Sequence, residues 1–164
     1  MSQVNYRWWK GKRGEWFVVA QVLLFFVLFW GPRSSSGLPE WTSPYAEICL
    51  VAGCFLLVTG ASMFIAGIFT LGRNITPLPY PKDQAEMVKR GPYRFVRHPI
   101  YSGGIIFAFG WALCSHGWFT IGYAIILFVF FDIKASREEE WLKDKFTGYE
   151  EYQKHVRKLI PFIY

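Results

Sequence analysis

Residues 48–71 read ICLVAGCFLLVTGASMFIAGIFTL and contain no charged side chain in 24 positions. An α-helix needs about 20 apolar residues to cross the hydrocarbon core of a membrane, which is roughly 30 Å thick. Apolar runs of about 15 residues can also be buried helices of soluble proteins, but this segment is too long and too apolar for that alternative. We therefore predict that this segment crosses a membrane and that the chain is an integral membrane protein.

Two further apolar runs predict the remaining transmembrane helices. Residues 16–30, WFVVAQVLLFFVLFW, hold one amide, Gln21, and no charge. Residues 100–131 are 32 uncharged residues interrupted at 115–117, a length that fits two short spans joined by a tight turn. The sequence thus predicts a single all-α integral membrane domain over residues 1–164. Its four transmembrane helices, the last two forming a hairpin, are expected at about 16–30, 47–71, 99–115 and 117–133.

The composition favours a membrane protein over a nucleic-acid-binding domain. The chain is 52% hydrophobic and 20% aromatic but only 18% charged, whereas soluble domains carry about 25% charged residues. Four spans place 17 of the 18 basic residues on the side of the termini and of residues 72–98. These include the N-terminal group Arg7, Lys10, Lys12 and Arg13. By the positive-inside rule that side is cytoplasmic, which in a bacterium means the cytoplasmic face of the inner membrane.

Two polar segments, residues 72–98 and 134–164, are expected on this cytoplasmic side. The first contains three prolines within residues 77–81, which favour an extended path over a helix. The second has an amphipathic pattern up to Phe146, a break at residues 147–148, and another short helical pattern beyond. We expect these amphipathic helices to lie at the membrane surface rather than to cross it.

The densest polar cluster beside an apolar run is RFVRHPIYSG, residues 94–103. Pro99 suits the first turn of the third span, because its missing N–H is not needed there. His98 then lies at the N-terminus of that helix, next to unpaired backbone donors and a partial positive charge. Basic residues flanking a span are also typical anchors, so composition alone leaves a pocket and an anchoring role both open.

A second cluster, residues 137–140 (REEE), lies on the first amphipathic helix of the tail. An acidic triplet is ordinarily the solvated face of such a helix, although carboxylates facing an aromatic pocket suit a cationic ligand. Tyr149 and Tyr152 share a helical face and are interpreted as interfacial anchors, with a pocket wall as the alternative. The three cysteines lack metal-binding spacing, so no metal site is predicted.

These two clusters, in this order, resemble the signature of a known family. GPYRFVRHPIYSGG (91–104) is similar to the Gly-Pro-Tyr-Arg…Arg-His-Pro-x-Tyr-x-Gly motif of the isoprenylcysteine carboxyl methyltransferase and phospholipid N-methyltransferase superfamily. The tail REEEWLKDKFTGYEEYQKHVRKLIPFIY (137–164) resembles the Glu-Glu-x-x-Leu…Ile-Pro ending of that family. GRNITPLPYP (72–81) is also similar to prokaryotic members, and the resemblance covers roughly residues 60–164.

The resemblance implies a small membrane methyltransferase that binds S-adenosylmethionine at its cytoplasmic side without a Rossmann domain. Carried over by position, the expected cofactor-binding residues are Tyr93, Arg97, His98, Tyr101, Gly103, Glu138 and Glu139. Glu138 is also expected to be catalytic, together with Arg137. The catalytic arginine of the family precedes the glutamate pair by a few residues, a spacing closer to Lys134, so Arg137 and Lys134 are both candidates for that role.

The expected reaction is methyl transfer to a lipophilic or membrane-delivered small acceptor: a prenylcysteine-like carboxylate, a lipid amine or a thiol. A carboxylate needs a cation such as Arg137 or Arg97 to hold it, whereas an ammonium must first lose a proton to a base such as His98. One alternative is an NADPH-dependent enzyme similar to the sterol reductases, whose tails also end in Pro-x-Ile-Tyr, as residues 161–164 do. The other is a non-catalytic membrane scaffold of the same fold. The expected surroundings are a lipid bilayer, and neither nucleic acid nor a metal is expected as a partner.

Overall fold

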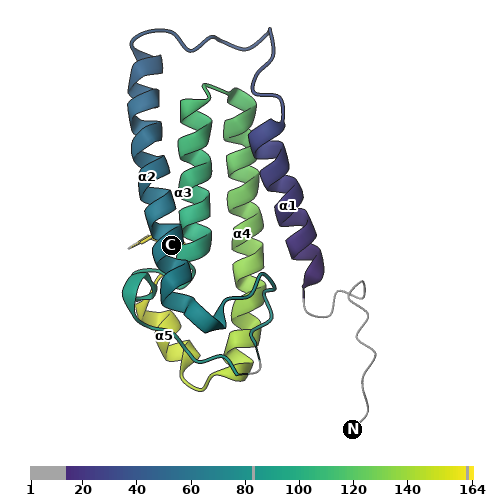
Figure 1. Ribbon diagram of the computed structural model, residues 1–164, viewed down its shortest axis with the longest axis vertical. Coiled ribbons are helices and arrows are strands. Elements are labelled where there is room, and N and C mark those ends of the chain that lie inside the picture. Colours follow the sequence, from purple (N-terminus) through teal and green to yellow (C-terminus); the bar gives the residue numbers. More distant parts are fainter. Residues whose placement is uncertain (1–13, 83, 162) are drawn as a thin grey trace.

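The computed structural model describes residues 14–82, 84–161 and 163–164. Its helices, in chain order, are α1 (Glu15–Trp30), α2 (Tyr45–Leu71), η2 (Gly72–Asn74), η3 (Gly91–Arg94), α3 (Pro99–Cys114), α4 (Trp118–Lys145) and α5 (Tyr149–His155). The four long helices lie side by side, and the connection after α2 and the tail with α5 gather at one end of them (Figure 1). The described residues contain no strand, only an isolated bridge between Val96 and Arg157, so the protein is all-helical.

Two of the helices are long and apolar enough to cross a membrane. Residues 45–74 and α4 contain windows with mean hydropathy 2.4 and 1.7. Only 11% of the first window is buried inside the protein, and Phe55 and Phe69 of α2 are 68% and 80% exposed. A core helix of a soluble protein would bury such side chains, so α2 faces lipid. α1 and α3 are also apolar but contain only 16 residues each.

The side of the membrane on which the polar end lies was predicted from the basic residues. Four of those residues, Arg7, Lys10, Lys12 and Arg13, lie outside the described residues. The cytoplasmic orientation therefore stays a prediction.

Helices α2 and α3 pack with their backbones in direct contact. Gly53, Gly60 and Gly67 recur every seven residues along α2 and are buried against α3. A Cβ atom at Gly60 would lie 2.5 Å from the backbone nitrogen of Phe107, and one at Gly103 would lie 2.5 Å from that of Phe64. Small residues allow this close approach, the usual way in which helices associate inside membranes.

The turn at residues 115–117 joins α3 to α4 as the predicted hairpin, but α4 is longer than expected. The sequence predicts a span ending near residue 133 and a separate amphipathic helix after it. In the structure α4 runs unbroken to Lys145, so the amphipathic segment is the last part of the spanning helix. Most residues of 132–145, such as Ala135, Glu138 and Lys143, are good helix formers, so the helix continues although its surroundings change. The tail segment up to residue 145 is thus an extension of α4 and not a separate surface helix.

The C-terminal segment is hydrogen-bonded to the start of α3 and the residues before it. The backbone N–H groups of Arg97 and His98 donate to the carbonyls of Arg157 and Lys158, at N···O distances of 2.8 and 3.2 Å. The hydroxyl of Ser102 donates to the carbonyl of Leu159 at 2.6 Å. These bonds hold the segment before α3 in one position, next to α4.

Candidate active site

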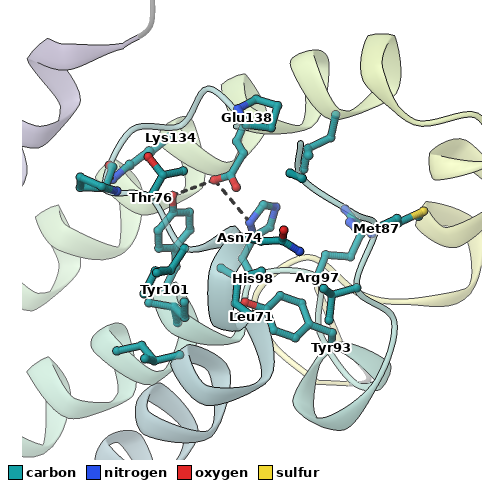
Figure 2. A pocket seen from close by; sticks show the side chains of 18 of the residues that line it. Leu71, Asn74, Thr76, Met87, Tyr93, Arg97, His98, Tyr101, Lys134 and Glu138 are labelled. Atoms are coloured by element: carbon teal, nitrogen blue, oxygen red, sulfur yellow. Dashed lines mark hydrogen bonds and ion pairs between the residues drawn. The ribbon is translucent and has the colours of Figure 1, made fainter. Parts of the chain in front are cut away.

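A cavity of about 490 Å³ lies where the polar ends of the helices meet the connection and the tail. Figure 2 shows side chains from α2, the connection, the start of α3 and α4 around this space. Its apolar walls are aromatic and aliphatic, and a smaller number of polar groups converge on it from several elements. The lining residues used below are Gln21, Phe25, Phe64, Ile68, Asn74, Thr76, Pro77, Tyr93, Arg97, His98, Tyr101, Phe131, Lys134, Glu138, Tyr149 and Tyr152.

The carboxylate of Glu139 is the centre of a buried hydrogen-bond network behind the cavity wall. Arg97 donates to both of its oxygens, through Nε at 2.7 Å and Nη2 at 3.3 Å. Nε2 of His98 lies 3.0 Å from Oε1, and the side chain of Gln153 donates to Oε2 at 2.7 Å. The side chain of Glu139 is only 10% exposed, and both of its oxygens have partners, from the segment before α3 and from the tail. Its geometry is that of a structural ion pair that orients Arg97 and His98.

The preceding residue, Glu138, is placed differently. It lines the cavity, and the hydroxyl of Tyr101 donates to its Oε2 at 2.7 Å (Figure 2). Nδ1 of His98 lies 3.8 Å from the same oxygen, and no bond to Oε1 is found among the described residues. The Tyr101 ring stacks between those of His98 and Phe131, with centroids 5.4 and 4.8 Å away. A carboxylate with a free oxygen beside aromatic faces suits a cationic ligand.

Lys134 lies one turn before Glu138 on α4 and also faces the cavity. It is 1% exposed, and its Nζ donates to Oε1 of Gln21 at 2.6 Å and to the carbonyl of Pro77 at 3.3 Å. Arg137 points elsewhere: its side chain is 54% exposed, pairs with Glu140 and lies over the Trp141 ring. Of the two candidate cations, the structure therefore brings Lys134 to the cavity and leaves Arg137 at the surface.

The tyrosines of the tail form part of the cavity wall. Tyr149 and Tyr152 are 4% and 8% exposed, and the hydroxyl of Tyr152 donates to the carbonyl of Tyr93 at 2.5 Å. Burial raises the pKa of all three tyrosines well above the usual value, so their hydroxyls stay protonated as hydrogen-bond donors. The interpretation of Tyr149 and Tyr152 as interfacial anchors is wrong, and the alternative, a pocket wall, is what the structure has.

The sequence-predicted site residues divide into two groups. Tyr93, Arg97, His98, Tyr101 and Glu138 come together along the cavity. The other three predicted residues, Gly103, Glu139 and Arg137, do not line it. Gly103 instead provides the close contact between α3 and α2, which is a packing requirement.

Sequence reasoning missed several residues that the fold brings to the cavity. Gln21 comes from α1, and Asn74 and Thr76 come from the connection after α2. Gln21 carried a detectable signal, because it is the one amide in an otherwise apolar run. Asn74 and Thr76 lie in a loop whose path is set by tertiary contacts, including the bond from Asn74 Nδ2 to the carbonyl of Glu86 at 2.9 Å. No periodicity marks such residues.

A helical membrane protein with a polar, aromatic cavity at one end is the class that fold and site define. Residues 48–148 match the model of the phospholipid methyltransferase family. This match covers more than half of the chain, and the chain belongs to the phospholipid methyltransferase family.

Individual relatives include a methyltransferase and a reductase. The chain is 31% identical over 115 residues to a probable protein-S-isoprenylcysteine O-methyltransferase of Oryza sativa subsp. japonica, covering 68% of this chain and 60% of the relative. It is 28% identical over 160 residues to steroid 5-alpha-reductase DET2 of Arabidopsis thaliana, covering 94% and 59%. The chain thus spans about 60% of the length of these curated relatives.

A solved structure shares the fold. The eukaryotic intramembrane Ras methyltransferase (isoprenylcysteine carboxyl methyltransferase) superposes with a TM-score of 0.64 at 22% identity. The match covers 90% of this chain and 51% of that chain. The prediction of an all-helical membrane protein of this superfamily is confirmed.

Proposed function

We propose that the protein is a membrane-embedded methyltransferase that uses S-adenosylmethionine to methylate a lipophilic acceptor. The observation that carries the proposal is a cavity in which Glu138, Tyr101 and His98 converge beside an apolar wall. The family of the chain and its isoprenylcysteine methyltransferase relatives support it. We further propose that α1 to α4 cross the membrane as four spans, with this cavity at the cytoplasmic face.

The residues of the cavity fit the methyl donor. A volume of about 490 Å³ lies in the range of roughly 300 to 1,000 Å³ that holds small molecules and cofactors. Bound S-adenosylmethionine supplies a methyl group already activated on a sulfonium cation. The Glu138 carboxylate and the ring of Tyr93 would hold that positive charge and the polar groups of the donor. Donor binding by these residues is supported by their placement around one space.

The apolar part of the cavity suits the acceptor. Phe25, Phe64 and Ile68 line it from α1 and α2. An acceptor with a hydrocarbon tail buries that tail against such residues, at about 25 cal/mol for each Å² removed from water. The walls also keep water from the reacting groups and fix the acceptor and donor in line, which is most of what a displacement at an activated methyl group requires.

Ligand binding to the purified protein tests the proposal. We expect S-adenosylhomocysteine to bind in a calorimetric titration and Glu138→Gln to weaken it. Transfer of a labelled methyl group to a prenylcysteine, phosphatidylethanolamine or a small thiol would then identify the acceptor class. Folded protein that does not bind S-adenosylhomocysteine would contradict the proposal.

The steroid reductase match over 94% of the chain favours one second candidate, an NADPH-dependent reductase. The same titration with NADPH distinguishes the two. Binding of NADPH in the absence of S-adenosylhomocysteine binding would replace the methyltransferase by the reductase.

A further inference from the structure

Two cysteines are in contact between α2 and α3. The sulfur atoms of Cys54 and Cys114 lie 3.9 Å apart, although 60 positions separate the two residues in the sequence. Cys114 is the last residue of α3, so the contact lies towards the end of the bundle opposite the cavity (Figure 1). Neither thiol lines the cavity, and the proposed function gives the contact no role.

The backbones around this pair are close enough for a disulfide. A Cβ atom at Gly53 would lie 2.6 Å from Sγ of Cys114 and 2.9 Å from its backbone nitrogen. One turn before Cys114, a Cβ atom at Gly110 would lie 2.7 Å from the backbone nitrogen of Leu57. A disulfide needs Cα atoms about 4.4 to 6.8 Å apart and an S–S bond of about 2.05 Å. Because the helices already touch here, rotation of the two side chains can bring the sulfur atoms from contact to bonding distance.

The two thiols differ in access. Cys54 is exposed on the surface of α2 that also carries Phe55 and Val58, each 68% exposed, which is the surface that faces lipid. Cys114 is partly buried between the helices, and its Sγ donates to the carbonyl of Leu50 at 3.8 Å. A reagent dissolved in the membrane therefore reaches Cys54 first and finds Cys114 behind it as a second thiol.

We propose that Cys54 and Cys114 are a redox modification site that closes to a disulfide between α2 and α3, with a small apolar disulfide as the oxidant. Cys54 loses its proton and its sulfur attacks one sulfur of the oxidant, so a mixed disulfide forms and one thiol leaves. Cys114 then loses its proton, attacks the Cys54 sulfur and releases the second thiol. Two electrons pass to the oxidant, and the two released thiols carry the two protons.

The disulfide strengthens a helix contact that depends on close packing alone. Lipid is as apolar as the helices, so glycine contacts inside a membrane gain nothing from the exclusion of water. A covalent bond between α2 and α3 keeps the helices together when their packing loosens, and it closes a long loop of the chain. Oxidation therefore stabilises the folded protein, and reduction reverses the effect.

The test compares two variants that each keep two cysteines. Cys49→Ala retains the proposed pair, Cys54 and Cys114. Cys114→Ala is the matched control, because its two cysteines lie five positions apart on α2 and point about 140° away from each other around the helix axis. Each variant is purified, diluted and treated with one equivalent of 4,4′-dithiodipyridine, an apolar disulfide. Released thiopyridone is measured by absorbance, and the mass of the chain by mass spectrometry.

We expect Cys49→Ala to release about two thiopyridones for each reagent molecule and to lose the mass of two hydrogen atoms, because the second thiol displaces the adduct. Cys114→Ala should release about one and keep the adduct. Oxidised Cys49→Ala should melt at a higher temperature than the reduced protein, and dithiothreitol should reverse the shift. The control should show no such rise.

Two outcomes overturn the inference. One is a stable adduct on Cys49→Ala, which would mean that the two sulfur atoms do not reach bonding distance. The other is a disulfide that leaves the melting temperature unchanged, which would mean that the bond adds nothing to the helix contact. Neither outcome involves S-adenosylhomocysteine, so the inference and the proposed function fail separately.

Discussion

The two sides of the helical bundle are built in opposite ways. Where α2 meets α3, glycines such as Gly60 and Gly103 bring the backbones together, and a single added Cβ would overlap the neighbouring helix. Where α1 and α4 face the connection, long side chains such as Gln21 and Lys134 line a cavity and bond to each other. One side is solid and the other hollow. The contrast indicates that the glycine contact fixes the backbone of α3, and the polar side chains on the hollow side are then held at defined positions.

The largest effect is expected from breaking the solid side. Gly103→Leu places a branched side chain against the backbone of Phe64, where not even a Cβ fits, so α2 and α3 must separate. We expect little or no folded protein after detergent extraction, measured by size-exclusion chromatography. Gly122→Leu on α4 is the control, because nothing lies within 4 Å of a Cβ there. Normal yield from Gly103→Leu would show that the contact is looser than the structure has it.

The next largest effect is expected at Glu139, which holds the cavity-lining residues Arg97 and His98 in position. Glu139→Gln removes the negative charge that Arg97 and His98 share, leaving a buried guanidinium without its counter-ion. Breaking such a pair costs about 3 kcal/mol. We expect a lower melting temperature and a lower midpoint of chemical unfolding. Unchanged unfolding would mean that the network contributes nothing to stability.

A neighbouring substitution should affect binding instead of folding. Glu138→Gln keeps the shape of a side chain that lines the cavity and has a 25% exposed carboxylate. We expect about 10- to 100-fold weaker binding of S-adenosylhomocysteine, consistent with the loss of a charge-assisted bond. The melting temperature should stay close to that of wild type, which is the control for this variant. Equal effects of Glu138→Gln and Glu139→Gln on stability would erase the distinction between the two carboxylates.

The smallest effect is expected at Arg137. Its ion pair with Glu140 is exposed on both sides, and such pairs contribute about 0 to 1 kcal/mol. We expect Arg137→Met to change the rate of methyl transfer by less than about twofold and to leave the affinity for S-adenosylhomocysteine unchanged. A loss of activity with normal donor binding would restore the catalytic role first expected for Arg137.

Much of the fold could be predicted from the sequence because hydrophobic length is a local property. The helices α1, α2 and α3 begin and end within two residues of the predicted 16–30, 47–71 and 99–115. The end of α4 could not be placed, since the change from apolar to charged residues at Asp132 marks a change of surroundings and not a change of backbone. Helix propensity continues through that boundary up to Lys145, and a composition-based limit therefore stops too early.

The candidate site was predictable where the motif fixes both spacing and environment. His98, Pro99 and Tyr101 lie within four positions of one another, and the start of α3 at Pro99 brings the side chains of His98 and Tyr101 to the cavity. The direction in which α4 side chains point is not local information. Lys134 and Glu138 are four residues apart and face the cavity, whereas Arg137 is rotated away from it, and only the packing of α4 against α1 and α3 decides this.

Because α4 is unbroken, it fixes the distance between side chains along its length. One turn of backbone, about 6 Å along the axis, separates Lys134 from Glu138. The spacing along the axis between Lys134 and Glu138 is therefore set by the hydrogen-bonded backbone, which loop movement does not change. Insertion of one alanine between Ala135 and Ser136 would turn Glu138 by about 100° around the axis and out of register with Lys134. Both side chains would still be present, but they would no longer face the same cavity.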